Sequence, residues 1–288
     1  MAEVVGNALL AHVPTIMLPE SIRRELNEGE DFSLVEGLNR FKSEVMEKLR
    51  PDLVIVFDSH WFTTVEFVVT SHKRRSGKFT SEELPRGMSQ IPYDLPGDPE
   101  FSQAWAGHAA AHGTWITPID DPYLPIHYAT VNIAEYLQYG SEAWVSISCP
   151  QTAETDDFLR AGRALRDAIA DFKKPRKILL IASGAMSHRF WSLKLLRQHE
   201  SAAVKHIFSP EHAAADLERI EWLKAGDHGR VIATMPEFLT FKPEASFGPY
   251  LMMAAAMGEA NWRDRGELYS LYENSIGTGQ VHINFKRQ

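Results

Sequence analysis

Three apolar runs, each leading to a histidine, limit the folds that this chain can adopt. Short runs of this kind, rich in β-branched residues, predict buried strands. The runs are residues 4–11, 54–57 and 177–182, and the histidines that follow them are His12, His60 and His188. The carboxyl ends of parallel strands meet at one edge of a sheet, so we expect the three histidines to face one pocket. A lone histidine at a strand end is more often a core residue bonded to the backbone.

The segments between these runs have helical spacing. Residues 34–49 and 155–172 place apolar side chains on one face, and Asp98 followed by Pro99 favours a capped helix over residues 99–112. Residues 247–257 are apolar almost all round, which predicts a buried helix. Strands that alternate with helices predict an α/β fold with a central, mostly parallel sheet flanked by helices. No linker divides the sequence, so we expect a single domain over residues 1–288.

Other segments are less regular. Residues 71–97 hold basic residues, glycines and prolines without periodicity, and we expect a long functional loop there. Residues 62–70 favour a further strand, and residues 200–208 favour a surface helix. The alternation in residues 268–274 and 281–285 favours a pair of strands joined through a glycine-containing turn.

Composition excludes several classes of protein. The formal net charge of −8, with scattered basic residues, argues against a nucleic-acid-binding protein. The sequence shows neither a secretory signal nor an apolar run of membrane-spanning length, so we expect no membrane partner. Cys149 is the only cysteine, which favours a reducing compartment, and we expect a cytoplasmic protein.

Two histidines and one carboxylate form the facial triad that holds non-haem Fe(II) and leaves positions open for substrate and oxygen. The three strand-end histidines are candidates for such a site, and one cysteine is too few for a thiolate-rich zinc site. An unrelated metal hydrolase could use the same kinds of ligand, and this alternative stays open.

The order of several motifs resembles that of the class III (LigB-type) extradiol ring-cleaving dioxygenases, most closely the bacterial 3,4-dihydroxyphenylacetate 2,3-dioxygenases of that class. Each motif alone is weak, but their order over most of the chain is specific. The motifs are His12-Val-Pro14, Val56-Phe-Asp-Ser-His60-Trp61, Thr80-Ser-Glu-Glu-Leu-Pro85, Ala182-Ser-Gly-Ala-Met-Ser-His188-Arg-Phe190, Met235-Pro-Glu237-Phe238 and Gly277-Thr-Gly-Gln280-Val281.

This resemblance implies a set of site residues. His12 and His60 match the two histidine ligands of the iron, and His188 matches the acid/base histidine. The third ligand of the family is a glutamate just before the buried C-terminal helix, which corresponds to Glu244 here, with Glu237 as the second choice.

The resemblance also implies substrate contacts. His127 and Tyr128 match pocket residues, although Ala129 replaces the glycine that relatives carry, and this departure weakens the match. Arg189, Arg86 or a residue of segment 71–97 could pair with the acid group of a carboxylated substrate.

The implied activity is Fe(II)-dependent extradiol cleavage of a catecholic ring by O₂, giving a muconic semialdehyde. The expected substrate is 3,4-dihydroxyphenylacetate or a related carboxylated catechol, and the expected assembly is a homo-oligomer. Three alternatives remain: a zinc-bound relative, a non-catalytic partner subunit, and an enzyme that cleaves rings of the 2-aminophenol or protocatechuate type.

Overall fold

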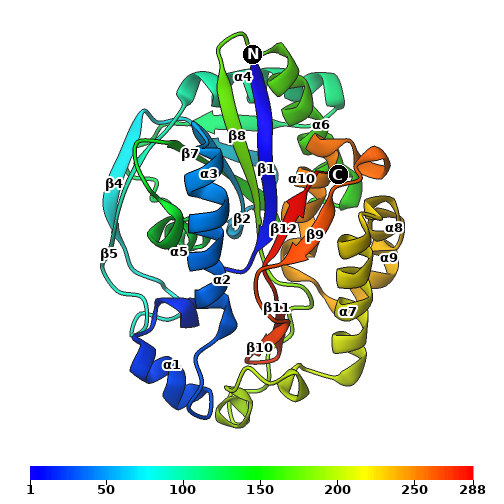
Figure 1. Cartoon of the computed structure of the whole chain (residues 1–288). Coiled ribbons are helices and arrows are strands. Elements are labelled where there is room, and N and C mark those ends of the chain that lie inside the picture. The colour runs from blue at the N-terminus through cyan, green and yellow to red at the C-terminus, as the bar shows by residue number, and fades with distance from the viewer. Residues whose placement is uncertain (288) are drawn as a thin grey trace.

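The fold is built around an eight-stranded sheet with helices on both faces (Figure 1). A computed structural model describes residues 1–287. The strands of this sheet lie in the order β6-β3-β7-β2-β8-β1-β12-β9. The strand bounds are β1 (Ala2–Leu10), β2 (Leu53–Thr63), β3 (Phe67–Thr70), β4 (Arg74–Phe79), β5 (Ile91–Pro96), β6 (Ile116–Ile119), β7 (Ala143–Pro150), β8 (Arg176–Ser183), β9 (Arg265–Leu268), β10 (Glu273–Ser275), β11 (Thr278–Gln280) and β12 (Ile283–Lys286).

The centre of the sheet is parallel. Strand β2 pairs in parallel with β7 and with β8, and β8 pairs in parallel with β1. Antiparallel pairing is confined to the flanks, where β12 joins β1 to β9 and β3 meets β7. The expectation of a mostly parallel sheet flanked by helices is confirmed, and the carboxyl ends of β1, β2 and β8 lie side by side.

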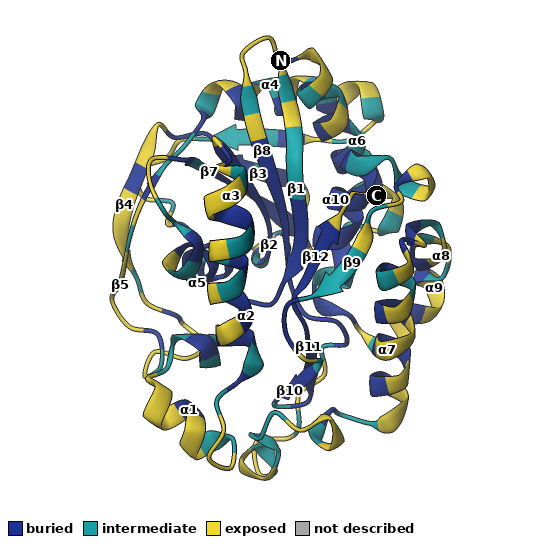
Figure 2. Ribbon diagram, in the orientation of Figure 1, coloured by how far each residue is buried: buried dark blue, intermediate teal, exposed yellow. Residues whose placement is uncertain are grey.

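Helices cover both faces of the sheet. Their bounds are α1 (Glu20–Leu26), α2 (Ser33–Phe41), α3 (Glu47–Leu49), α4 (Pro99–Ala109), α5 (Tyr128–Leu137), α6 (Thr155–Asp171), α7 (Pro210–Ala225), α8 (His228–Ala233), α9 (Met235–Phe238) and α10 (Gly248–Met257). Along β2, Ile55 and Phe57 belong to the core cluster that includes α6 and α10, whereas Val54 and Val56 belong to the one that includes α2 and α5. Both faces of β2 are therefore buried (Figure 2), which explains why its sequence is a continuous apolar run.

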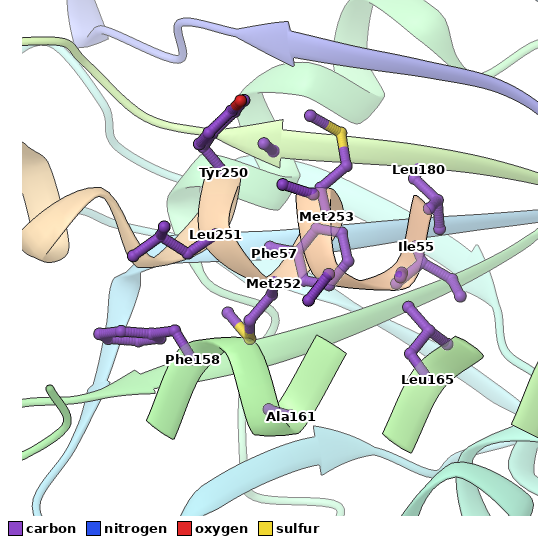
Figure 3. Packing of buried hydrophobic residues seen from close by; sticks show 14 of the residues in the cluster. Ile55, Phe57, Phe158, Ala161, Leu165, Leu180, Tyr250, Leu251, Met252 and Met253 are labelled. Atoms are coloured by element: carbon purple, nitrogen blue, oxygen red, sulfur yellow. The ribbon is translucent and has the colours of Figure 1, made fainter. Parts of the chain in front are cut away.

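Helix α10 is the buried helix that its sequence predicts. It lies between α6 and the sheet, and Figure 3 shows its Met252 beside Phe158 and Ala161 of α6. Gly162 of α6 permits this approach, because a Cβ there would lie 2.2 Å from the carbonyl oxygen of Met252. Within residues 1–287, no helix combines the length and apolar character that a membrane crossing requires.

Two expectations about local structure were wrong. Residues 71–97 are not a structureless loop, because β4 and β5 pair there as an antiparallel hairpin. Strand β4 is mostly polar and carries an ion pair across to Asp94 from Arg74, and the alternation of Ile91, Tyr93 and Leu95 in β5 is short and interrupted by prolines, so the hairpin has only a weak strand signal. Residues 62–70 are not one strand either, since β2 continues to Thr63 and β3 begins at Phe67.

The C-terminal half departs from expectation in two places. Residues 200–208 contain only a short 3₁₀ turn at Val204–His206. Asn274 Nδ2 donates to the carbonyl oxygens of His199 and Ser201, and tertiary bonds of this kind replace the ladder of a helix. Residues 268–274 divide, because β9 pairs with β12 while Glu273–Ser275 pairs with β11.

Candidate metal centre and its cavity

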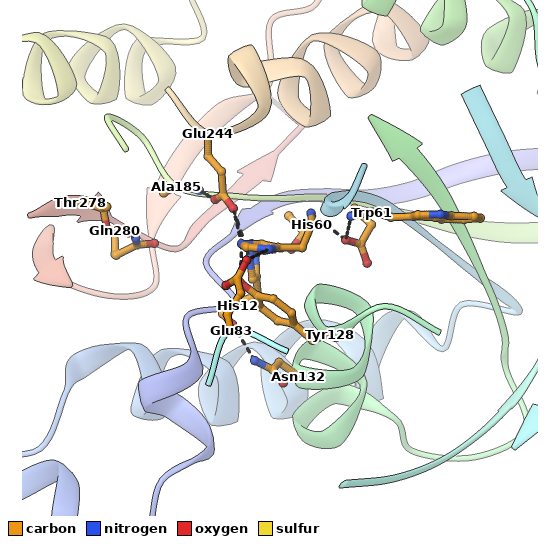
Figure 4. Close-up of polar contacts among 12 residues, drawn as sticks. His12, His60, Trp61, Glu83, Tyr128, Asn132, Ala185, Glu244, Thr278 and Gln280 are labelled. Atoms are coloured by element: carbon orange, nitrogen blue, oxygen red, sulfur yellow. Dashed lines mark hydrogen bonds and ion pairs between the residues drawn. The ribbon is translucent and has the colours of Figure 1, made fainter. Parts of the chain in front are cut away.

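His12, His60 and Glu244 converge at the carboxyl edge of the sheet (Figure 4). His12 follows β1, His60 lies near the end of β2, and Glu244 comes from the segment before α10. One ligand atom from each residue lies within 4.8 Å of the other two. Glu244 Oε1 is 2.9 Å from His60 Nε2 and 3.4 Å from His12 Nε2. The fold thus brings together residues that lie more than 230 positions apart in the sequence.

The donor set fits a metal cation. Glu244 is buried, and its Oε2 accepts a hydrogen bond of 2.5 Å from the backbone N–H of Ala185. Its Oε1 has no hydrogen-bond partner among the described residues, although it faces two imidazole nitrogens. A buried carboxylate oxygen without a partner is costly, and a cation between it and the imidazoles would remove that cost. Two neutral imidazoles and one carboxylate are ligands that suit Fe(II).

Electrostatics favour the ionised form of this glutamate. Burial by itself raises the pKa of Glu244. Electrostatic interactions with His12 and His188, and the close contacts with His12 and His60, lower it by more, so the pKa lies well below its usual range. The negative charge that a divalent cation needs is therefore present at neutral pH.

The backbone after Glu244 is strained. Ala245, Ser246 and Phe247 have φ angles of 46°, 56° and 59°, in the left-handed region that non-glycine residues avoid at a cost of about 1–2 kcal/mol each. A short bridge holds this segment, because Glu244 N–H donates to Met186 and His188 N–H donates to Lys242. The same bridge therefore fixes both Glu244 and the residue expected to act as acid and base.

His12 is oriented from behind. Its Nδ1 lies 2.8 Å from Ser183 Oγ at the end of β8, which leaves Nε2 to face Glu244. The neighbouring Ala11 N–H donates to Nδ1 of His282 over 3.0 Å, and Asn132 Nδ2 donates to the carbonyl oxygen of His12 over 2.7 Å. Contacts of this kind fix the ring orientation and tautomer of a metal-binding histidine.

His60 is oriented by Asp58. The ladder between β2 and β7 shifts register between Phe57 and Phe62, an irregularity of the kind that redirects side chains next to active sites. Inside it, Asp58 Oδ1 accepts hydrogen bonds of 3.0 Å from the backbone N–H groups of His60 and Trp61. The hydroxyl of Tyr128, at the start of α5, contacts His60 Nε2. Burial, together with nearby carboxylates, raises the pKa of this phenol, so it remains a hydrogen-bond donor at neutral pH.

A cavity of about 260 Å³ opens beside the three candidate ligands. Its wall combines apolar side chains, including Val13, Phe190 and Ile276, with His188 and Tyr128. Burial lowers the pKa of His188 even though Glu244 opposes this effect, so the imidazole is neutral at neutral pH. An apolar wall with a few convergent polar groups is typical of a small-molecule site.

Several residues suggested by the sequence lie elsewhere. His127 stacks on Trp61 at 5.1 Å and is not among the residues that line the cavity. The guanidinium of Arg189 lies over the ring of Phe208, 4.0 Å from its centroid. Arg86 and Glu237 are exposed, and Glu237 lies 3.5 Å from a nitrogen of Arg219.

Four residues of the site were not singled out from the sequence: Asp58, Glu83, Ser183 and Gln280. Asp58 and Ser183 end apolar strand runs and also lie within the motifs that contain His60 and His188, and these two signals could have found them. Glu83 and Gln280 lie within the motifs that carry the family resemblance, yet their side chains reach the cavity only through the fold.

Comparisons with known proteins identify a family for this chain. The family model described as "Catalytic LigB subunit of aromatic ring-opening dioxygenase" matches residues 6–286. The 3,4-dihydroxyphenylacetate 2,3-dioxygenase of Escherichia coli is 28% identical over 192 residues, which cover 66% of this chain and 68% of that protein. The 2-aminophenol 1,6-dioxygenase beta subunit of a Pseudomonas species is 26% identical over 310 aligned positions, which cover 98% of this chain and 94% of that subunit.

A solved structure shares the fold. The crystal structure of an uncharacterized protein from Escherichia coli K12 superposes with a TM-score of 0.64 at 15% sequence identity, covering 97% of this chain and 98% of that one. At this identity the similarity speaks for the fold alone.

Proposed function

This chain belongs to the LigB family of aromatic ring-opening dioxygenases, and we propose that it cleaves a catecholic ring by Fe(II)-dependent extradiol addition of O₂. One observation carries the proposal: the unpartnered Oε1 of buried Glu244 faces the imidazoles of His12 and His60 beside the cavity. Fe(II) held by these three residues would offer neighbouring positions to the ring oxygens and to O₂.

The remaining roles fall to the cavity wall. His188 is neutral at neutral pH, so its imidazole accepts the proton of a ring hydroxyl. It later donates this proton back to the reacting molecule as the ring opens. Tyr128 remains protonated, and when the ring binds its hydroxyl donates to a ring oxygen in place of Glu83 Oε2, 3.5 Å away. The apolar side chains around them pack against the ring and exclude water.

The ring substrate is the least constrained part of the proposal. The names of two relatives contain 3,4-dihydroxyphenylacetate and 2-aminophenol, so both compounds belong in a first panel together with unsubstituted catechol and protocatechuate. Preference for a carboxylated ring rests on the first relative, because Arg189 and Arg86 are not among the cavity-lining residues.

The test is anaerobic reconstitution with Fe(II), followed by a catechol and then air. The proposal predicts oxygen uptake and a yellow semialdehyde product, and both should disappear in the Glu244→Ala variant. Tightly bound iron without product from any ring in the panel would instead favour the non-catalytic partner subunit. Reconstitution with Zn(II) in parallel separates an iron enzyme from a zinc-bound relative, since only the former would consume O₂.

We also propose that the protein works in the cytoplasm as a homo-oligomer. A reducing compartment agrees with the buried, unpaired thiol of Cys149. Light scattering of the purified protein tests the assembly, and a monomer at micromolar concentration would contradict it.

A further inference from the structure

Two polar side chains of the cavity wall, Glu83 and Gln280, offer oxygen atoms as hydrogen-bond acceptors, and Glu83 also carries negative charge. Glu83 lines the mouth and Gln280 lies deeper, on the hairpin β10–β11. Among residues 1–287, no Lys or Arg side chain is part of this wall. A ring that carries a carboxylate would therefore enter a pocket whose wall offers that group no Lys or Arg partner.

The orientation of the Gln280 amide is fixed by its neighbours. Thr278 Oγ1 donates its proton to the carbonyl oxygen of Ser275 over 2.8 Å, so this hydroxyl can only accept from Gln280. Gln280 Nε2 makes that bond, at 2.7 Å. The amide oxygen of Gln280 therefore points the other way, and Figure 4 shows it on the side of His12 and Glu244.

This amide oxygen is a free acceptor. Gln280 is only 2% exposed, and its Oε1 has no hydrogen-bond partner among the described residues. A buried acceptor without a partner is costly, and a hydrogen-bond donor on a bound molecule would satisfy it. A carboxylate, which has no donor when ionised, cannot do so.

Glu83 adds negative charge on the side of His60. Its Oε1 lies 3.7 Å from His60 Nδ1, and its Oε2 accepts from the hydroxyl of Tyr128 over 3.5 Å. The side chain is 59% exposed and stands at the cavity mouth. An anionic substituent would meet like charge there, whereas a neutral or cationic one would not.

The neighbouring arginine does not compensate for this charge. Arg189 is adjacent to His188 in sequence, but its guanidinium lies on the face of Phe208. Gly277 packs against the Arg189 backbone, since a Cβ there would lie 2.4 Å from its carbonyl oxygen. The turn between β10 and β11 thus fixes the backbone of Arg189, whose side chain lies on Phe208 and not in the cavity wall.

We infer that the ring substrate carries an uncharged or cationic substituent with a hydrogen-bond donor, such as a hydroxyl, amide or amine, and that Gln280 and Glu83 select it over a carboxylate. This inference rests on the proposed ring cleavage. It names the substrate class for that site and reverses the preference expected from the sequence.

A matched substrate pair tests the inference. The neutral 3,4-dihydroxyphenylacetamide and the anionic 3,4-dihydroxyphenylacetate have the same shape and differ in charge and donor. We expect kcat/KM to be higher for the amide by about tenfold or more, because the acid leaves a buried acceptor unpaired. Unsubstituted catechol serves as the reference. No turnover of catechol, amide or acid would refute the proposed function itself, whereas turnover with a preference for the acid would refute only this inference.

Two variants assign the selection to residues. Gln280→Leu, nearly the same size, should lower kcat/KM for the amide by about tenfold and change the value for catechol much less. Glu83→Gln should bring the kcat/KM values for the amide and the acid closer together. Glu82→Gln removes an exposed acid outside the cavity wall and should leave the ratio of these two values unchanged. An equal loss for amide, acid and catechol in Gln280→Leu would show that Gln280 does not read the substituent.

The wild-type comparison keeps the test valid if the buried Gln280→Leu substitution prevents folding. Anaerobic dissociation constants of the Fe(II) protein for the amide and the acid give a second readout. Tighter binding of the acid than of the amide would overturn the inference without any turnover measurement.

Discussion

Asp58 joins the two parts of the chain that carry His60 and Tyr128. The side chain is fully buried and accepts four hydrogen bonds. Its Oδ1 receives the backbone N–H groups of His60 and Trp61, and its Oδ2 receives the backbone N–H and the hydroxyl of Thr130 at 3.0 and 2.7 Å. One carboxylate therefore ties the end of β2 to the first turn of α5.

Replacing Asp58 with Asn changes only the contacts with Thr130. The amide oxygen keeps the bonds from His60 and Trp61, but the amide nitrogen then faces the two donors of Thr130. The hydroxyl of Thr130 can turn to Ser146 Oγ, 2.9 Å away, whereas the backbone N–H cannot move. One buried donor without a partner and the loss of the anionic acceptor together should lower the free energy of unfolding by about 2–4 kcal/mol.

Urea unfolding followed by tryptophan fluorescence measures this loss, and titration with Fe(II) measures its effect on the metal site. We expect Asp58→Asn to weaken metal binding by about tenfold or more, as the loss of an outer-shell contact usually does. Thr130→Val is the matched control, because it removes one hydroxyl and should cost about 1–2 kcal/mol. Wild-type stability and metal affinity in Asp58→Asn would refute the argument that this carboxylate positions His60.

Three further predictions follow from the same contacts. His188→Phe should bind Fe(II) like the wild type but lose about a hundredfold or more in turnover, and unchanged kcat would remove His188 from proton transfer. Burial lowers the pKa of His282 to about 3 and that of His228 to about 4, while it raises the pKa of Asp216 to about 6. The unfolded histidines take up protons near pH 6.5, so stability should be greatest above that pH and fall as the pH drops toward 4. The net slope of the free energy of unfolding from these three groups is about 1.4 kcal/mol per pH unit, because the aspartate opposes one histidine, and His72, whose pKa burial lowers to about 4, adds to the slope with the same sign; urea midpoints that rise on acidification would contradict this. Ile276 has a φ of 48°, so Ile276→Gly should raise the thermal midpoint, and a fall of several degrees would argue against strain at that turn.

The sequence predicts the centre of this molecule better than its periphery. Buried parallel strands are marked by their own residues, so the runs before His12, His60 and His188 could be identified without any tertiary information. The hairpin β4–β5 could not, because β4 is mostly polar and the apolar alternation of Ile91, Tyr93 and Leu95 in β5 is short and interrupted by prolines. Periodicity does not report the pairing of the two strands or a polar contact such as Arg74–Asp94.

The site divides in the same way. The convergence of His12 and His60 follows from the order of parallel strands, but Glu244 depends on a left-handed turn that no propensity predicts. Arg189 was a candidate to pair with the acid group of a carboxylated substrate, yet its guanidinium lies on the ring of Phe208. Gln280 acquires its role only through hydrogen bonds to Thr278 and from there to Ser275, which depend on the hairpin turn.

The most direct test of the central claim is the fate of ¹⁸O₂ during turnover of a catechol by the Fe(II)-loaded protein. The account predicts that mass spectrometry finds both labelled atoms in a single semialdehyde product, and that the label disappears when Glu244 is replaced by Ala. A protein that binds Fe(II) through His12, His60 and Glu244 yet leaves every catechol intact, or yields product without label from O₂, would contradict it.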